Sequence, residues 1–504
     1  MKKDESAQKN GECRDTLVPA RSWKEHINRI DPFRVNIEKI AETPMRTGAT
    51  IYVSESLMKK CLEDNSVQQA VNVATLPGIL GRSMAMPDIH FGYGFPIGGV
   101  AATDMTEGVI SPGGVGYDIN CGVRLLTTGL KLEDIHNRVQ HLVNAIFKNV
   151  PSGVGSKGQI KLSERDIRGV LEDGAGWAVR SGYGTETDMH RLEEGGCLKE
   201  ADSSLVSREA KDRGMGQLGS LGAGNHFLEI QRVDEIFDKD AAKAFGVREV
   251  GQIMVMFHTG SRGLGHQVCT DYLKEMQSAV RKYKICLPDR QLACAPVDSQ
   301  EGIAYYKAMC CAANFGWANR QMITHWVRKS FKDVLGEDFL SKGMDVVYDV
   351  AHNIAKKEEH TVDGRLTKVM VHRKGATRAF GPGHKVLPSE YKDYGQPVLI
   401  PGDMGTCSYL LVGTEQAMRE TFGSTCHGAG RAMSRNEALA SFTKESVVKK
   451  LNTSGIYIQA ATKDGIVEEA QGAYKDVSEV VEVVHGAGIS RKVARLVPVG
   501  VMKG

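Results

Sequence analysis

The chain has 504 residues, of which 41% are hydrophobic and 25% charged, and its formal net charge is only +3. A charge so close to balance excludes a broad polyanion-binding field, so any contact with nucleic acid has to come from local basic clusters. The length allows two to four domains, but the sequence offers no linker at which to divide them. The 56 glycines gather in short loops, which indicates many sites of close backbone approach.

Cysteine usage bears on the compartment. The eleven cysteines are scattered singly apart from the adjacent Cys310 and Cys311, and no CxxC pair occurs. This pattern favours free thiols in a reducing compartment. The first residues lack an apolar signal core, and no uninterrupted apolar run reaches membrane-spanning length. We therefore expect a protein of the cytoplasm and/or nucleus, with a polar, flexible leader at residues 1–29.

From Phe33 onward, short strand-like runs such as residues 49–54 alternate with helical stretches. The segment Leu76–Ala102 is rich in turn residues, and we expect loops there. It carries Asp88 and His90, which are either supporting groups of a functional site or ordinary polar loop residues.

The next segment, Ser111–Arg124, is a glycine-rich bend that places Asp118 and Cys121 three residues apart. A carboxylate and a thiol at this spacing can face one metal ion. The alternative is that Cys121 is a small buried hydrophobic residue and that Asp118 caps a turn.

Helical periodicity then predicts an amphipathic helix packed on a core, from the apolar positions Leu132, Ile135, Val139, Leu142, Val143 and Ile146. Residues 160–215 are charged and indicate surface helices and loops.

Three later segments place a histidine at one end of an apolar strand, either just before its first residue or just after its last. Asn225, His226 and Glu229 stand at the start of one strand, His258 follows the strand 253–257, and His352 with Asn353 follows the strand 346–350. After His258, the sequence GSRGLG predicts a flexible loop before a helix of about five turns.

These histidines and the Asp/Cys pair supply five potential ligands, which suffice for one or two metal ions if they converge: Asp118, Cys121, His226, His258 and His352. Their chemistry leaves the metal open. A thiolate with imidazoles suits zinc, whereas a carboxylate with positions left for phosphate suits manganese or magnesium.

Basic and glycine-rich loops follow. One strand ends in His372, Arg373 and Lys374, and another loop surrounds His427 with glycines and ends in Arg431. Free backbone N–H groups in such loops can cradle an anion, although no Walker loop is present. His427 is either a nucleophile that attacks phosphorus or part of a structural turn.

Seven of these motifs resemble, in the same order, those of the RtcB-type RNA ligases, and most closely those of the catalytic subunits of eukaryotic tRNA-splicing ligases. The resemblance runs from about residue 30 to the last residue. The motifs are DINCGVR (118–124), GAGNHFLEI (222–230), HTGSRGLGHQ (258–267), DVAHNIAK (349–356), HRKGATRAF (372–380), MGTCSYLLVGTE (404–415) and STCHGAGR (424–431).

The resemblance implies a single large α+β catalytic domain over residues 30–504. It implies an enzyme that uses GTP and two Mn²⁺ ions to join RNA ends with a 2′,3′-cyclic phosphate or 3′-phosphate to 5′-hydroxyl ends. Asp118, Cys121 and His226 would hold one ion, and Cys121 would bridge to a second ion held by His258 and His352. His427 would attack the α-phosphorus of GTP, and GMP would then pass to the RNA 3′-phosphate.

The resemblance also implies contacts with the substrates. Arg431 and Arg435 would meet RNA phosphates, and loops such as HRKGATR would form a basic groove. The loop acid Asp403 would face the phosphates, with an effect on GTP affinity that the sequence leaves open. The expected GTP site comprises Asn225, His226, Phe227, Leu228, Glu229, His352, Asn353, Pro401, Gly402, Asp403, Met404, Ser408, His427, Gly428, Ala429, Gly430 and Lys503.

The expected substrates are tRNA exon halves, with messenger RNA splicing or RNA repair as further roles, and the expected partners are a helicase of a tRNA ligase complex and an archease activator. Two alternatives stay open: a metal-dependent cyclic phosphodiesterase and a non-catalytic RNA-processing scaffold. His427 and Lys503 argue for the ligase, because a hydrolase needs neither a nucleophilic histidine nor a guanine contact.

Overall fold

The computed structural model describes residues 22–336, 339 and 342–504. Residues 1–21 of the expected leader therefore lie outside the described residues. Its remaining residues form the 3₁₀ helix η2 (Ser22–His26) and the start of strand β1. Trp23 is buried and donates from its indole N–H to Gln68, so the chain already contributes to a core at this point.

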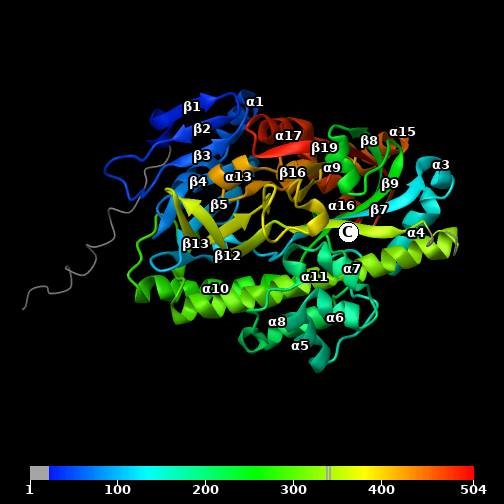
Figure 1. The fold of residues 1–504 in the computed structure, drawn as a ribbon, viewed down its shortest axis with the longest axis horizontal. Coiled ribbons are helices and arrows are strands. Elements are labelled where there is room, and N and C mark those ends of the chain that lie inside the picture. Colours follow the sequence, from blue (N-terminus) through cyan, green and yellow to red (C-terminus); the bar gives the residue numbers. More distant parts are fainter. Residues whose placement is uncertain (1–21, 337–338, 340–341) are drawn as a thin grey trace, which may run out of the picture.

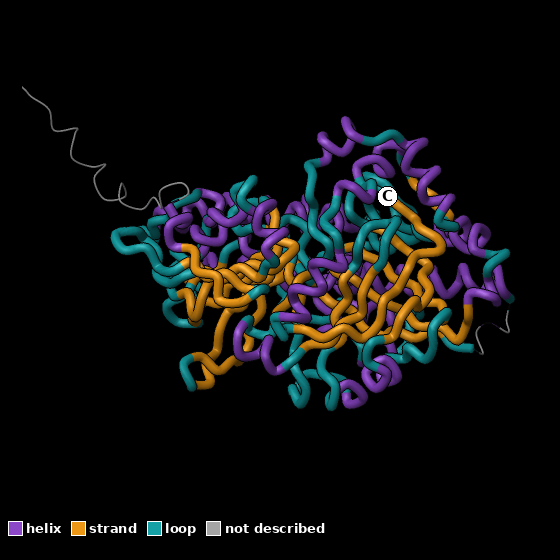
Figure 2. The backbone as a smooth tube through the Cα atoms, turned by 90° about the horizontal axis from the view of Figure 1, so that it is seen from above, coloured by secondary structure: helices purple, strands orange, loops and turns teal. Residues whose placement is uncertain are grey.

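Two large sheets organise the molecule, and Figure 2 shows their strands as two groups side by side. The seven-stranded sheet has the order β1-β2-β3-β4-β5-β13-β12. Its strands are β1 (Ile27–Asp31), β2 (Arg34–Ile37), β3 (Ala49–Tyr52), β4 (Ile79–His90), β5 (Ile97–Asp104), β13 (Arg365–Lys374) and β12 (Asn353–Val362).

The loops expected over Leu76–Ala102 are wrong, because most of this segment forms β4 and β5. The turn residues are accommodated as irregularities within the pair: the register shifts between Leu80 and Met84 and again between Ala85 and His90. Gly81 takes a φ of +62°, a value that glycine adopts without strain.

In the eight-stranded sheet, the main path has the order β11-β7-β9-β8-β19-β16-β15, and every neighbouring pair along it is antiparallel. A further strand, β18, pairs in parallel with β19. The strands are β11 (Met344–Ala351), β7 (Gly122–Lys131), β9 (Gln252–Thr259), β8 (Phe227–Ile236), β19 (Ser490–Lys503), β16 (Ser408–Gly413), β15 (Pro397–Ile400) and β18 (Tyr457–Ala460).

This antiparallel order places the site. Where neighbours run in opposite directions, the last residue of one strand lies beside the first residue of the next. The register pairs Ala351 with Gly122, Gly122 with Thr259, and Phe227 with both His258 and Lys503. Polar residues at the ends of consecutive strands therefore lie at one edge of the sheet. They are His352, Cys121, His258, His226 and Lys503.

Two short ribbons complete the sheets: β6 (Val109–Ile110) pairs with β10 (Ala295–Pro296), and β14 (Ala376–Arg378) pairs with β17 (Ser424–Cys426). His427 directly follows β17.

Helices cover the sheets, and the two longest, α10 (Arg262–Lys282) and α11 (Gln300–Leu335), run side by side along the lower side in Figure 1. The others are α1 (Glu55–Cys61), α2 (Ser66–Val73), α3 (Leu132–Ile135), α4 (Val139–Asn149), α5 (Glu164–Asp173), α6 (Ala175–Arg180), α7 (Glu186–His190), α8 (Arg208–Met215), α9 (Lys239–Ala244), α13 (Glu415–Glu420), α14 (Arg435–Ser441), α15 (Lys444–Thr453), α16 (Lys463–Glu468) and α17 (Val477–Gly486).

Two helix predictions need correction. The single amphipathic helix expected from Leu132 is two helices, α3 and α4, separated by a turn in which the Arg138 N–H donates to the Ile135 carbonyl at 2.7 Å. The loop GSRGLG largely belongs to α10, which begins at Arg262. Gly265 suits this first turn because a Cβ there would lie 1.9 Å from the Ser261 hydroxyl.

The mixed α/β single domain confirms the expected fold class. Its largest core cluster surrounds α11, which buries residues along most of its length. Nine of the described cysteines are free thiols. No helix within the described part of the chain is long and apolar enough to cross a membrane.

Candidate functional site

The five potential metal ligands converge at the sheet edge. Cys121 Sγ lies 3.4 Å from His226 Nε2 and 3.1 Å from His258 Nε2. His226 Nε2 lies 2.9 Å from a carboxylate oxygen of Asp118, and His258 Nε2 lies 3.1 Å from His352 Nε2. Within each of two triads the ligand atoms all lie within 4.8 Å of one another, and both triads contain Cys121.

The protonation of the histidines suits metal binding. Burial and nearby cationic groups hold the pKa of His258 and of His352 well below the ordinary value, so both rings are neutral. His258 Nδ1 lies 3.2 Å from the Asn225 carbonyl oxygen, which accepts a hydrogen bond from the Nδ1–H and leaves the Nε2 lone pair facing the cluster. His352 Nε2 and the sulfur of Cys121 both lie 3.1 Å from His258 Nε2, an arrangement that a cation between these atoms would stabilise.

The protonation of Asp118 and Cys121 is also compatible with metal binding. Burial alone would raise the pKa of Asp118, but the hydrogen bond and charge of His226 outweigh it and lower that pKa. Burial and the Asp118 charge raise the pKa of the Cys121 thiol well above its usual value. A bound cation would remove this thiol proton, because coordinated thiols deprotonate. The donor set therefore fits one or two divalent cations.

A cavity of about 350 Å³ opens beside this cluster and is lined by residues of both large sheets. Most of the expected GTP-site residues line it. His226, Leu228 and Ser408 do not: Leu228 packs into the core, and Ser408 accepts a hydrogen bond from Gln231 beneath the loop that begins at Pro401.

His427 faces this cavity and is held from behind by Asp88, which lies on β4. The Nδ1 atom of His427 lies 2.5 Å from Asp88 Oδ2, and the ring centroids of His427 and His352 are 4.8 Å apart. Burial would raise the pKa of Asp88, but the charge and hydrogen bonds of His427 lower it, so Asp88 is a carboxylate. The carboxylate accepts a hydrogen bond from the Nδ1–H of His427, and the Nε2 lone pair is left free for attack.

The opposite side of the cavity carries a network of buried charges around Glu469, a residue that the sequence did not reveal. Lys503 Nζ lies 3.2 Å from Glu469, and Glu469 also pairs with Arg431 at 3.0 Å and with the hydroxyl of Tyr474. No spacing or motif indicates Glu469, since it lies 34 residues from Lys503. The Arg431 guanidinium, expected to meet RNA phosphates, is instead bound within this network, whereas Arg435 is half exposed at the cavity wall.

Two acidic residues differ in their surroundings. Burial raises the pKa of Glu229 to about 7. Asp403 directs its carboxylate into its own turn, where it accepts hydrogen bonds from the Gly405 N–H at 2.8 Å and from the Thr406 hydroxyl at 2.9 Å. Each oxygen of Asp403 therefore accepts one hydrogen bond within its own loop.

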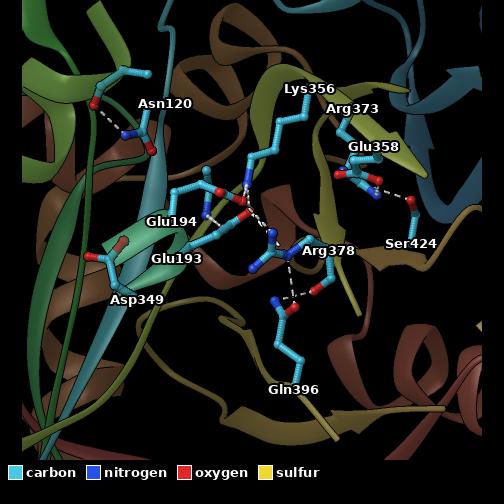
Figure 3. A network of polar contacts seen from close by, with 12 residues as sticks. Asn120, Glu193, Glu194, Asp349, Lys356, Glu358, Arg373, Arg378, Gln396 and Ser424 are labelled. Carbon is cyan, nitrogen blue, oxygen red and sulfur yellow. Dashed lines mark hydrogen bonds and ion pairs between the residues drawn. The ribbon is translucent and has the colours of Figure 1, made fainter. Parts of the chain in front are cut away.

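The prediction that the loop HRKGATR (372–378) forms a basic groove is wrong. Arg373 and Arg378 are buried in the polar network of Figure 3, where Arg373 pairs with Glu358 and Ser424, and Arg378 pairs with Glu194 and Gln396. The guanidinium groups of both arginines are buried and pair with carboxylates instead of facing solvent. An RNA groove must use other residues.

Comparison with known proteins agrees with this geometry. Residues 69–504 match the family model described as tRNA-splicing ligase RtcB. A tRNA-splicing ligase RtcB of Methanococcus maripaludis is 58% identical over 460 residues, which are 91% of this chain and 95% of that protein. Another, of Thermococcus kodakarensis, is 56% identical over 478 residues, which are 95% of this chain and 99% of that protein.

Proposed function

The chain belongs to the RtcB family of tRNA-splicing ligases and is an RNA ligase, and from this premise we propose that it is activated by GTP and Mn²⁺ through a histidine-linked GMP. The RNA ends would be a 2′,3′-cyclic phosphate or 3′-phosphate and a 5′-hydroxyl. The observation that carries the proposal is the position of His427, with Nδ1 bound to Asp88 and its ring beside the metal-ligand cluster.

Asp118, Cys121 and His226 would hold one Mn²⁺ ion, and Cys121, His258 and His352 would hold a second. Bound there, the ions would neutralise charge on the reacting phosphates and lower the pKa of a bound water or hydroxyl. The neutral histidines, held by burial, keep their lone pairs available at the pH of the cell.

His427 Nε2 would form a bond to the α-phosphorus of GTP while the bond to pyrophosphate breaks. The ring gains positive charge as this bond forms, and the Asp88 carboxylate at Nδ1 stabilises that charge. GMP then passes from Nε2 to the RNA 3′-phosphate, and the 5′-hydroxyl displaces it to form the new phosphodiester bond.

The rest of the cavity suits a guanine nucleotide. Lys503 can donate to the guanine O6 atom, an acceptor that adenine replaces with a donor. Glu229 lies on the same side, near enough for the Lys503 charge to lower its pKa, and its carboxylate can accept from guanine N–H groups. Gly428, Ala429 and Gly430 line the part of the cavity next to His427.

The test is incubation of the purified protein with α-labelled GTP and Mn²⁺, followed by denaturing electrophoresis. We expect an acid-labile, base-stable label on the parent and none on His427→Ala. Label that persists on His427→Ala would reject this nucleophile. A parent that opens cyclic phosphates but takes no label would be a phosphodiesterase, and a parent with neither activity would favour the scaffold.

A further inference from the structure

Arg320, near the middle of α11, connects to three of the four chain segments that carry the metal ligands, those of Cys121, His258 and His352. We propose that Arg320 is a positioning residue that fixes the spacing of these segments and thereby sets the affinity of the metal centre. The proposal rests on the metal site described above. It concerns a residue that contacts none of the ligand side chains, and its effect would be transmitted through the backbone.

The guanidinium of Arg320 is fully buried and uses all five of its N–H donors. Nη1 donates to the carbonyl of Asn120 at 2.8 Å and to the carbonyl of Thr259 at 2.9 Å. Asn120 directly precedes the ligand Cys121, and Thr259 directly follows the ligand His258. One nitrogen atom therefore joins two ligand-bearing segments.

The third segment is bound through Asp349. Nε and Nη2 of Arg320 each donate to one oxygen of this carboxylate at 2.8 Å, a two-point contact that fixes orientation as well as distance. Asp349 lies on β11, three residues before the ligand His352. The remaining Nη2 donor reaches Oδ1 of Asn120 at 2.8 Å.

Asn120 and Gly316 have conformations and sizes that allow these contacts of Arg320. Asn120 has a φ of +52°, and its side-chain amide also donates to the Ala313 carbonyl on α11 at 2.6 Å. Gly316 on α11 leaves room for Asn120, because a Cβ there would lie 3.0 Å from the Asn120 amide nitrogen. The left-handed turn before Cys121 is thus held against α11 at two points, and α11 is a continuous helix of 36 residues.

Arg124 offers a matched control. It is equally buried and pairs with the same carboxylate, through Nε to Asp349 at 2.7 Å. Its Nη1 atom donates instead to Gln321 and Thr324 on α11, so it touches no backbone next to a ligand. Both arginines neutralise Asp349, but only Arg320 also donates to the backbone beside two ligands, at Asn120 and Thr259.

The experiment compares Arg320→Lys with Arg124→Lys. Lysine keeps the charge but cannot reproduce the planar fork of five donors. The readouts on metal-free protein are Mn²⁺ affinity by calorimetry, the thiolate-to-cobalt charge-transfer band with Co²⁺, and the melting temperature. We expect Arg320→Lys to weaken Mn²⁺ binding about 10–100-fold and to alter the cobalt band, as loss of outer support does at other metal sites. Arg124→Lys should lower the melting temperature to a similar extent and leave Mn²⁺ affinity and the band unchanged.

Equal losses of Mn²⁺ affinity in the two variants, or parent-like affinity in Arg320→Lys, would overturn the proposal. If Arg320→Lys fails to fold, Asn120→Gly keeps the left-handed turn and removes one acceptor of Arg320. Asn120→Gly should weaken Mn²⁺ binding, as Arg320→Lys does, and unchanged affinity would overturn the proposal.

A parent that binds no Mn²⁺ would reject the metal site itself together with this inference. A parent that binds Mn²⁺ and takes the GMP label, beside an unaffected Arg320→Lys, would reject the inference alone.

Discussion

Asp88 Oδ2 accepts hydrogen bonds from both the side chain and the backbone of His427, at 2.5 Å from Nδ1 and 2.9 Å from the backbone nitrogen. The same oxygen lies 3.3 Å from the backbone nitrogen of Gly428. One buried carboxylate therefore fixes the ring, its tautomer and the start of the glycine loop.

Asp88→Asn should slow guanylylation of His427. The amide can keep an acceptor at Nδ1 but lacks the negative charge that stabilises the ring during attack, so we expect a rate lower by about 10²–10⁴-fold. Single-turnover transfer of α-labelled GMP gives the rate, and equilibrium binding gives the affinity for GTP. The affinity should change little because Asp88 is buried behind the ring. A parent-like transfer rate would contradict the assigned role.

Cys121→Ala should release both metal ions, whereas His226→Ala should release one. The reason is that Cys121 belongs to both ligand triads and His226 to only one. Elemental analysis of dialysed protein measures Mn per chain, and the melting temperature with and without a chelator shows whether the folded state still depends on the metal. Equal Mn content in the two variants would reject the bridging thiolate.

Lys503→Met should reduce the preference for GTP over ATP. A hydrogen bond from a cation contributes about 1.5–3 kcal/mol, so we expect GTP affinity to fall about 10–100-fold with little effect on ATP. Arg431→Met is the control, because it removes the other cation of Glu469 and leaves Lys503 in place. Similar losses of selectivity in both variants would show that the network around Glu469, and not a guanine contact, is responsible.

Glu229 should make stability depend on pH. Its pKa in the folded protein is about 7, above the ordinary value of 4.5, because burial disfavours the charged form. The folded state therefore binds more protons than the unfolded state between these values. The free energy of unfolding then falls as pH rises through this window, by up to about 1.4 kcal/mol per pH unit.

Glu229→Gln should remove this slope, and the groups facing Glu229, Lys503 and Asp403, are unchanged in the variant. Urea unfolding of parent and variant at several pH values measures the difference. Parallel curves for the two proteins between about pH 5 and pH 7 would contradict the raised pKa.

Much of the site could be read from the sequence because local patterns place its residues. An apolar run that ends in a polar residue predicts a strand end, and His258 and His352 indeed stand at the ends of β9 and β11. Residue chemistry then limits what Asp118 and Cys121 can bind. The resemblance to the RtcB family supplied roles that spacing alone left open.

Local patterns failed where long-range pairing decides the conformation or the environment. Turn residues in β4 and β5 indicated loops, yet pairing between the two strands absorbs them as bulges. Arg373 and Arg378 suggested an exposed basic loop, and only their buried partners show otherwise. Burial depends on what packs on a segment, which its own residues do not specify.

The sequence by itself determined the kinds of candidate ligand and their positions at strand ends, because these follow from side-chain chemistry and local hydrophobic patterning. Only the tertiary structure decided that the ligands meet, because convergence requires the antiparallel order of β11, β7, β9 and β8. It also decided the pairing of Asp88 with His427, which lie 339 residues apart. Hydrogen bonds of this kind depend on distance in space, which the spacing of residues along the chain does not encode.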